Sequence, residues 1–144
     1  MQRNLLRWAK SAFRADVHRA SDKVRKNVQG NIRQGKDGAG NSMVNIKPQT
    51  LDMPIRFATD KTKRREVRSS RKPLVARGNA VNSIKMKKGK DRDIIEPSTK
   101  HGRTVFRYNA LSAPTKRDAL VVGDNHEKII EDEILKGLDK ALRF

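Results

Sequence analysis

The chain has 144 residues, a formal net charge of +18 and no cysteine. The absence of cysteine excludes disulfide bonds, thiolate zinc sites and cysteine nucleophiles. Only 35% of the residues are hydrophobic, with one Trp, one Tyr and four Phe. We therefore expect a single domain over residues 1–144 with one modest, mainly aliphatic core. The positive charge favours acidic partners, either nucleic acid or protein surfaces.

Apolar runs are short throughout the chain. No stretch approaches the roughly 18 apolar residues that a membrane-spanning helix needs. Charges also interrupt the N-terminal segment, where a secretory signal would need a continuous apolar run of about 7–15 residues. We therefore expect a protein made in a reducing cytoplasm, without a membrane partner.

Residues 4–33 carry the clearest helical period. Their apolar side chains recur every three or four residues and predict one buried stripe, made of Leu5, Ala9, Phe13, Val17, Ala20, Val24, Val28 and Ile32. The other faces are strongly basic, and we expect Arg7, Lys10 and Arg14 to contact partners. A solvated charged face is the alternative. Gly35 is expected to stop the helix.

Residues 34–73 predict a loop followed by an extended basic arm. The glycine-rich part, residues 34–45, has no Gly-Lys-Ser/Thr ending and no apolar strand before it, so a nucleotide-binding loop is excluded. Residues 46–73 hold few apolar side chains and are expected to order only against neighbours. The expected partner or DNA contacts there are Arg64, Arg65, Arg68 and Arg71. A disordered basic linker is the alternative interpretation.

Residues 74–122 predict a small antiparallel sheet that packs one face on the helices. A short helical turn near residue 80 leads into the first strand, which ends near Met86. Further strands are predicted at residues 93–96, 104–108 and 119–122. Lys87 and Lys88 belong to a basic run that could neutralise phosphates.

The strongest prediction is a helix over residues 124–142. Asp124 is expected to cap it with Glu127 three residues on, and acidic residues precede basic ones as the helix dipole favours. The expected core stripe consists of Ile130, Ile134, Leu138 and Ala141 or Leu142, widened by Ile129 and Leu135. Its carboxylates are expected to face water.

The titratable residues predict no catalytic or metal site. The three histidines, His18, His101 and His126, are far apart in the sequence and are expected at the surface. Asp91, Asp93 and Glu96 are expected in a solvated turn, because lysine and arginine flank them. Convergent groups around a cleft are needed for catalysis, so we expect no enzyme and no cofactor.

Nucleic-acid binding is the alternative function. The basic runs suit phosphate contacts, yet only Phe106 and Tyr108 offer aromatic rings on one predicted strand face, a thin stacking platform. Sequence-specific recognition is therefore not expected, whereas non-specific contact with DNA stays open. A toxin-like or ribosome-associated basic protein is a further alternative.

Three short motifs follow one another in the middle of the chain. Asp37 and Gly38 lie in a glycine loop, residues 47–51 read Lys-Pro-Gln-Thr-Leu, and residues 74–84 read Leu-Val-Ala-Arg-Gly-Asn-Ala-Val-Asn-Ser-Ile. In this order they resemble motifs of the virion-morphogenesis proteins of tailed phages, also called tail-completion or neck proteins. That family has an Asp-x-Gly loop, a Pro-x-x-Thr segment and a Leu-Val-x-Thr-Gly-x-Leu-x-x-Ser-Ile block. Arg77 stands here in place of its Thr.

The resemblance covers residues 34–142 and implies a structural virion protein of the head–tail junction. Such a neck, connector or tail-completion subunit would form a ring around the DNA channel. The implied partners are copies of itself, neighbouring connector, tail-terminator or tail-tube proteins, and DNA in the channel. Gly78 would supply a turn conformation that other residues resist, and Ser83 would begin the first strand with Ile84 inward. The predicted fold is α+β: an N-terminal and a C-terminal helix packed on a small antiparallel sheet, with an extended basic arm.

Overall fold

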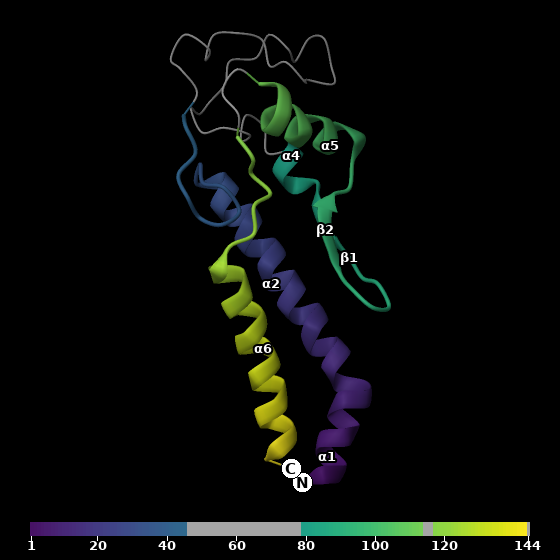
Figure 1. The fold of residues 1–144 in the computed structure, drawn as a ribbon. Helices are drawn as coiled ribbons and strands as arrows, with labels where there is room; N and C mark the ends of the chain where they lie inside the picture. The colour runs from purple at the N-terminus through teal and green to yellow at the C-terminus, as the bar shows by residue number, and fades with distance from the viewer. Residues whose placement is uncertain (46–78, 114–116, 144) are drawn as a thin grey trace.

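The computed structural model describes residues 1–45, 79–113 and 117–143. Two long helices lie side by side as an arm, with both chain termini at the same end of it (Figure 1). The elements in chain order are α1 (Gln2–Arg7), the π-helical segment η1 (Trp8–Ala12), α2 (Phe13–Arg33), α4 (Asn79–Asn82), β1 (Ile84–Lys87), β2 (Ile94–Pro97), α5 (Lys100–Arg107), the π-helical segment η3 (Tyr108–Ser112) and α6 (Asp124–Leu142). The fold is α+β, as predicted.

The predicted N-terminal helix is present as the continuous run α1, η1 and α2. Its apolar stripe is buried only in the second half, where Val24, Val28 and Ile32 join the core cluster. In the first half, Leu5 is 39% and Phe13 38% exposed. A π-helical turn holds an extra residue compared with an α-helical one, so the stripe before η1 no longer continues the stripe after it.

The core lies at the end of the arm remote from the termini. It consists of Val24, Val28, Ile32, Ala80, Val81, Ile84, Val105, Phe106 and Ala119. The helix α2 ends there at Arg33 with Gln34 as its C-cap, and Gly35 follows with a φ of 81°. This left-handed conformation suits glycine and confirms the predicted stop.

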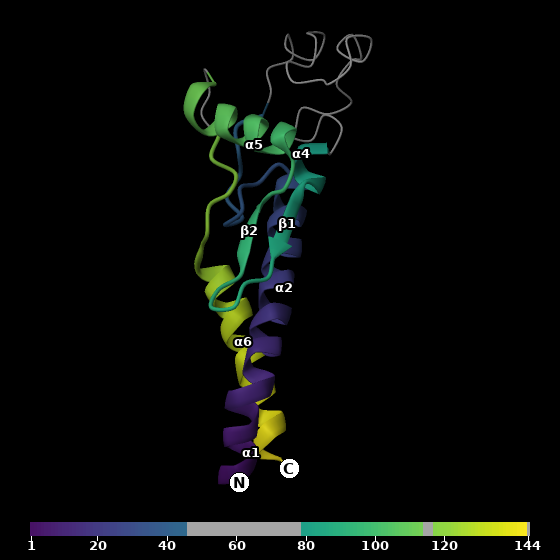
Figure 2. The same ribbon diagram turned by 90° about the vertical axis from the view of Figure 1, so that its right-hand side faces the viewer.

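The strands β1 and β2 form an antiparallel hairpin that packs along α2 (Figure 2). Ile84 lies opposite Pro97, and Met86 lies opposite Ile95. Ile84 is fully buried while its neighbour Lys85 is exposed. The prediction of a helical turn leading into a first strand with Ile84 inward is therefore confirmed.

The third and fourth predicted strands are wrong. Residues 104–108 lie in α5 and η3. The Thr99 side chain caps this helix by accepting a hydrogen bond from the Gly102 backbone N–H, and Val105 and Phe106 face the core. Residues 119–122 are irregular, and Ala119 accepts a backbone hydrogen bond from Gly38 of the glycine loop. A β-strand forms hydrogen bonds along the edge of a neighbouring strand, and the irregular glycine loop does not offer such an edge.

The helix α6 is present over the predicted residues, but its cap and its buried face differ from the prediction. Gly123, rather than Asp124, is the N-cap, and its backbone N–H donates to the His126 ring. The buried positions are His126, Glu133 and Gly137. The predicted core stripe is partly right: Ile134, Leu138 and Ala141 are half-buried and Ile129 packs against the core, whereas Ile130 and Leu135 are 39% and 52% exposed. Within the described residues, no helix is long and apolar enough to cross a membrane.

Candidate functional site

A buried carboxylate marks the crossing of α2 and α6. Asp16 is 2% exposed and accepts a hydrogen bond from the Trp8 indole N–H at 2.7 Å, and it also pairs with Arg19. A Cβ built on Gly137 would lie 2.0 Å from the Asp16 Oδ2 atom. The absence of a side chain at Gly137 therefore creates the space for this carboxylate.

A second carboxylate joins the same two helices one turn nearer the core. Glu133 is 8% exposed and binds the Lys23 ammonium group at 2.5 Å and that of Lys136 at 3.1 Å. The hydrogen bonds from Lys23 and Lys136 lower the pKa of Glu133, whereas burial acts in the opposite direction. The expectation that the carboxylates of α6 all face water is wrong at this position.

A cluster of polar side chains surrounds His126 in the first turn of α6. His126 is 1% exposed, and its Nε2 lies 3.2 Å from the Asn27 Oδ1 atom, which also accepts from Asn125 and Asn31. The ring's Nδ1 accepts from the Gly123 N–H at 3.3 Å. The expectation of a surface histidine is therefore wrong for His126, because the glycine loop and Gly123 cover its ring. An isolated histidine in the sequence gives no sign of such burial.

Burial lowers the pKa of His126, and a hydrogen bond to the Gly38 backbone acts more weakly in the opposite direction. The folded ring therefore binds a proton less readily than the ring in the unfolded chain, whose pKa has the ordinary value of 6.5. The free energy of unfolding is then expected to fall as the pH drops below 6.5, because the unfolded state binds more protons.

This pH dependence is checked by denaturant unfolding of the wild type and His126→Gln between pH 7 and pH 5, a range of about two units around the imidazole pKa. The glutamine variant is expected to show the shallower dependence. His101→Gln is the matched control, because His101 has no side-chain partner among the described residues. An unchanged slope in His126→Gln would contradict the assignment.

The hairpin is held to α2 by a third buried carboxylate. The side chain of Asp93 is 3% exposed and lies 2.7 Å from an Arg14 nitrogen and 2.8 Å from His18 Nδ1. Arg14 also donates to the Gly89 carbonyl at 2.5 Å. The prediction of a solvated turn fails for Asp93, since the hairpin folds back onto α2. Arg14 therefore serves the fold rather than a free contact surface.

The other predicted contact residues are dispersed. Arg7 and Lys10 are exposed on the N-terminal helix, and Arg7 lines a groove between η1 and the end of α6. Lys87 and Lys88 lie on the hairpin, while Ser83 is buried and donates to the Ala80 carbonyl at 2.6 Å. Five predicted residues lie outside the described residues: Arg64, Arg65, Arg68, Arg71 and Gly78.

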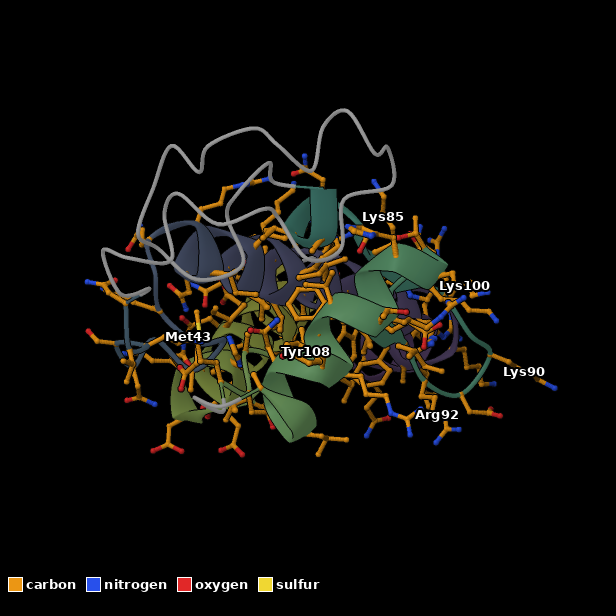
Figure 3. All side chains as sticks on the ribbon, turned by 90° about the horizontal axis from the view of Figure 1, so that it is seen from above. Met43, Lys85, Lys90, Arg92, Lys100 and Tyr108 are labelled. Carbon is orange, nitrogen blue, oxygen red and sulfur yellow. The ribbon has the colours of Figure 1, made fainter. Side chains whose placement is uncertain are left out.

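Unpaired cations gather on the hairpin. We call this surface the basic hairpin. It consists of the exposed side chains of Lys85, Lys87, Lys88, Lys90 and Arg92. None of them has an ion-pair partner within the part of the chain that the structure describes. Seen along the arm, Lys85, Lys90, Arg92 and Lys100 project on one side of the molecule (Figure 3). This surface can bind an acidic partner.

The outer face of α6 carries the opposite charge and unburied apolar groups. The outer stripe of α6 comprises Glu127, Glu131, Leu135 and Leu142, which are spaced four, four and seven residues apart and so share one helix face. Glu127 and Glu131 are exposed and form no ion pair with another described residue. The stripe therefore passes from acidic to apolar along the helix.

A groove between α2 and β1 is lined by Arg19, Lys23, Lys26 and Lys88, but the first three are paired with Asp16, Glu133 and Asp22. Its cations are thus largely neutralised. Across the described ranges, no group of three or more His, Asp or Glu side chains could hold a metal ion.

Comparisons of this chain with protein-family models, with curated proteins and with solved structures find no match.

Proposed function

We propose that this chain is a structural subunit of the head–tail junction of a tailed phage, where copies of it close into a ring around the DNA channel. Its partners in the virion are its own copies and neighbouring connector, tail-terminator or tail-tube proteins. It acts by assembly rather than by catalysis.

The observation that carries the proposal is the exposed apolar surface of α6. The helix buries polar or small residues against α2, such as Glu133 and Gly137, and leaves Leu135 52% and Leu142 40% exposed. A long helix with leucines on its outer face gains free energy when another molecule covers them, at roughly 25 cal/mol per Å² of apolar area. Leu5 and Leu6 add exposed apolar groups at the same end of the arm.

We infer the place of assembly, the head–tail junction, from the sequence motifs. The glycine loop and the block at residues 74–84 resemble those of virion-morphogenesis proteins. The described part of that block, residues 79–84, contributes Val81 and Ile84 to the core, and the glycine loop packs on the segment before α6. Both motifs thus have structural roles, as expected in an assembly subunit.

We expect the purified protein to have the mass of a closed oligomer, measured by light scattering and native mass spectrometry over a concentration series. Leu135→Lys combined with Leu142→Lys is expected to shift the mass to that of the monomer without loss of helical content. The matched control is Val44→Lys, because Val44 is 64% exposed but lies off the two-helix arm. A wild-type chain that stays monomeric at every concentration contradicts the proposal.

A second candidate, a non-specific nucleic-acid-binding protein, is favoured by the basic hairpin and by the exposed Lys100 and Arg107 of α5. Such binding would weaken steeply with salt as counterions are released from the phosphates. Titration of the monomer with duplex DNA across a salt series separates the two functions.

A further inference from the structure

The outer stripe of α6 and the basic hairpin lie beside the same stretch of α2. Residues 126–133 of α6 bind residues 23–27 of α2 through His126, Glu133 and their partners. The hairpin binds residues 14–29 of α2, from Arg14 near its tip to the Gln29 amide, which donates to the Ile84 carbonyl at 3.0 Å. The two surfaces are therefore at similar heights along the arm.

They also lie on different sides of α2. Figure 1 shows α6 on one flank of α2 and the hairpin on the other, and Figure 3 shows Lys85 and Lys90 projecting on the side away from Met43. A rotation about an axis roughly parallel to the arm would bring the α6 flank of one copy to the hairpin flank of the next. Heterologous contacts of this kind close into rings when the rotation closes.

The two surfaces are complementary in charge. Glu127 and Glu131 have no ion-pair partner in the described ranges, and the same holds for Lys87 and Lys90. Opposite charges at matched heights attract each other and set the register of association. Within one copy they cannot meet, because α2 lies between them.

An apolar group accompanies the charges on each surface. Lys87 lies opposite Ile94 in the hairpin register, and Ile94 is 39% exposed. On the other surface, Leu135 follows Glu131 by one helical turn and is 52% exposed. Each surface therefore offers an apolar group beside its charges, the arrangement of a specific protein contact with a polar rim.

We propose that the outer stripe of α6 in one copy docks on the basic hairpin of the next copy, so that Glu127 and Glu131 meet Lys87 and Lys90 while Leu135 covers Ile94. This inference rests on the proposed function, because it names the contact by which the ring closes. The occupant of the hairpin is thus an acidic helix of this same chain rather than nucleic acid.

Charge exchange tests the contact. The acidic-side variant carries Glu127→Lys and Glu131→Lys, and the hairpin variant carries Lys87→Glu and Lys90→Glu; Lys87 faces Ile94 across the hairpin, so its change creates no like-charge pair. Each variant alone is expected to associate at least about a hundredfold more weakly than the wild type, because like charges then face each other. An equimolar mixture of the two, and the chain carrying all four changes, are expected to assemble again.

The matched control is Arg33→Glu with Arg107→Glu, which changes the net charge as much as the hairpin variant does but lies on exposed positions at the end of the arm remote from the termini. It is expected to assemble like the wild type. Circular dichroism and thermal unfolding verify that each variant is folded.

Two outcomes overturn the inference and leave the proposed function standing. In the first, both variants assemble like the wild type. In the second, the hairpin variant assembles normally but loses salt-dependent binding to duplex DNA, which would assign the hairpin to nucleic acid. A wild type that is monomeric at all concentrations instead overturns the proposed function and the inference with it.

Discussion

Replacing Gly137 with alanine is expected to destabilise the fold by roughly 2 kcal/mol, although alanine is the better helix former. The added Cβ would lie 2.0 Å from Asp16 Oδ2 and 2.5 Å from its Cγ. The carboxylate cannot move away freely, because Trp8 and Arg19 hold it and only 2% of the residue is exposed. The free energy of unfolding by denaturant, followed by circular dichroism, measures the effect.

Gly30→Ala is the matched control, since Gly30 lies inside α2 and its added Cβ meets nothing within 4 Å. It is expected to stabilise the fold by roughly 0.5–1 kcal/mol, the ordinary gain of alanine over glycine in a helix. In a chain that already carries Asp16→Ser, the further change Gly137→Ala is expected to lower the free energy of unfolding much less than it does in the wild type. Equal stabilisation by alanine at both glycines would refute the role assigned to Gly137.

Asp93→Ala is expected to cost roughly 2–3 kcal/mol and to loosen the hairpin from α2, because Arg14 and His18 lose a buried carboxylate partner. Hydrogen exchange of the hairpin amides should accelerate more than that of α6, and denaturant unfolding gives the total loss. Asp91→Ala is the matched control, because Asp91 is exposed in the same turn and is expected to change stability by less than about 0.5 kcal/mol.

The contact of Asp93 with Arg14 and His18 also predicts that the free energy of unfolding depends on pH in the acid range. Burial of the Asp93 carboxyl raises its pKa, but hydrogen bonds from His18 and Ser21 and the charges of His18 and Arg14 outweigh it, so the pKa is lowered from 3.8. The stabilisation is therefore present above pH 3.8 and is lost as the pH falls through the lower, folded-state pKa. Asp93→Ala should flatten this part of the stability profile, whereas an unchanged profile would contradict the assignment.

The long elements could be predicted from the sequence because their signals are local. The period of Ala20, Val24, Val28 and Ile32 and the stop at Gly35 required only neighbouring residues to interpret. The first two strands could be predicted for the same reason, whereas the inward position of Ile84 was implied by the resemblance. The β-branched and aromatic residues at 104–108 predicted a strand wrongly, because the Thr99 cap and the core contacts of Phe106 favour a helix.

One signal in the sequence could have revealed the buried polar groups. Asp16 stands four residues before Ala20 and thus continues the stripe Ala20, Val24 and Val28, so the helical period already placed a carboxylate on the buried face. Gly137 stands four residues after Glu133 on the buried face of α6 in the same way. Reading polar and small residues together with the apolar ones would have found this face.

Local period, charge and turn chemistry thus determined the two helices, the hairpin and the basic character of this protein from its amino acids alone. Tertiary structure decided which face of α6 turns inward, because that depends on the fit of Gly137 to Asp16 and of His126 to Asn27 across two helices far apart in sequence. It also decided that Leu135 stays outside and that Asp93 is buried. Packing between distant segments is not encoded in any one segment's pattern, and the candidate assembly surface is what that packing leaves uncovered.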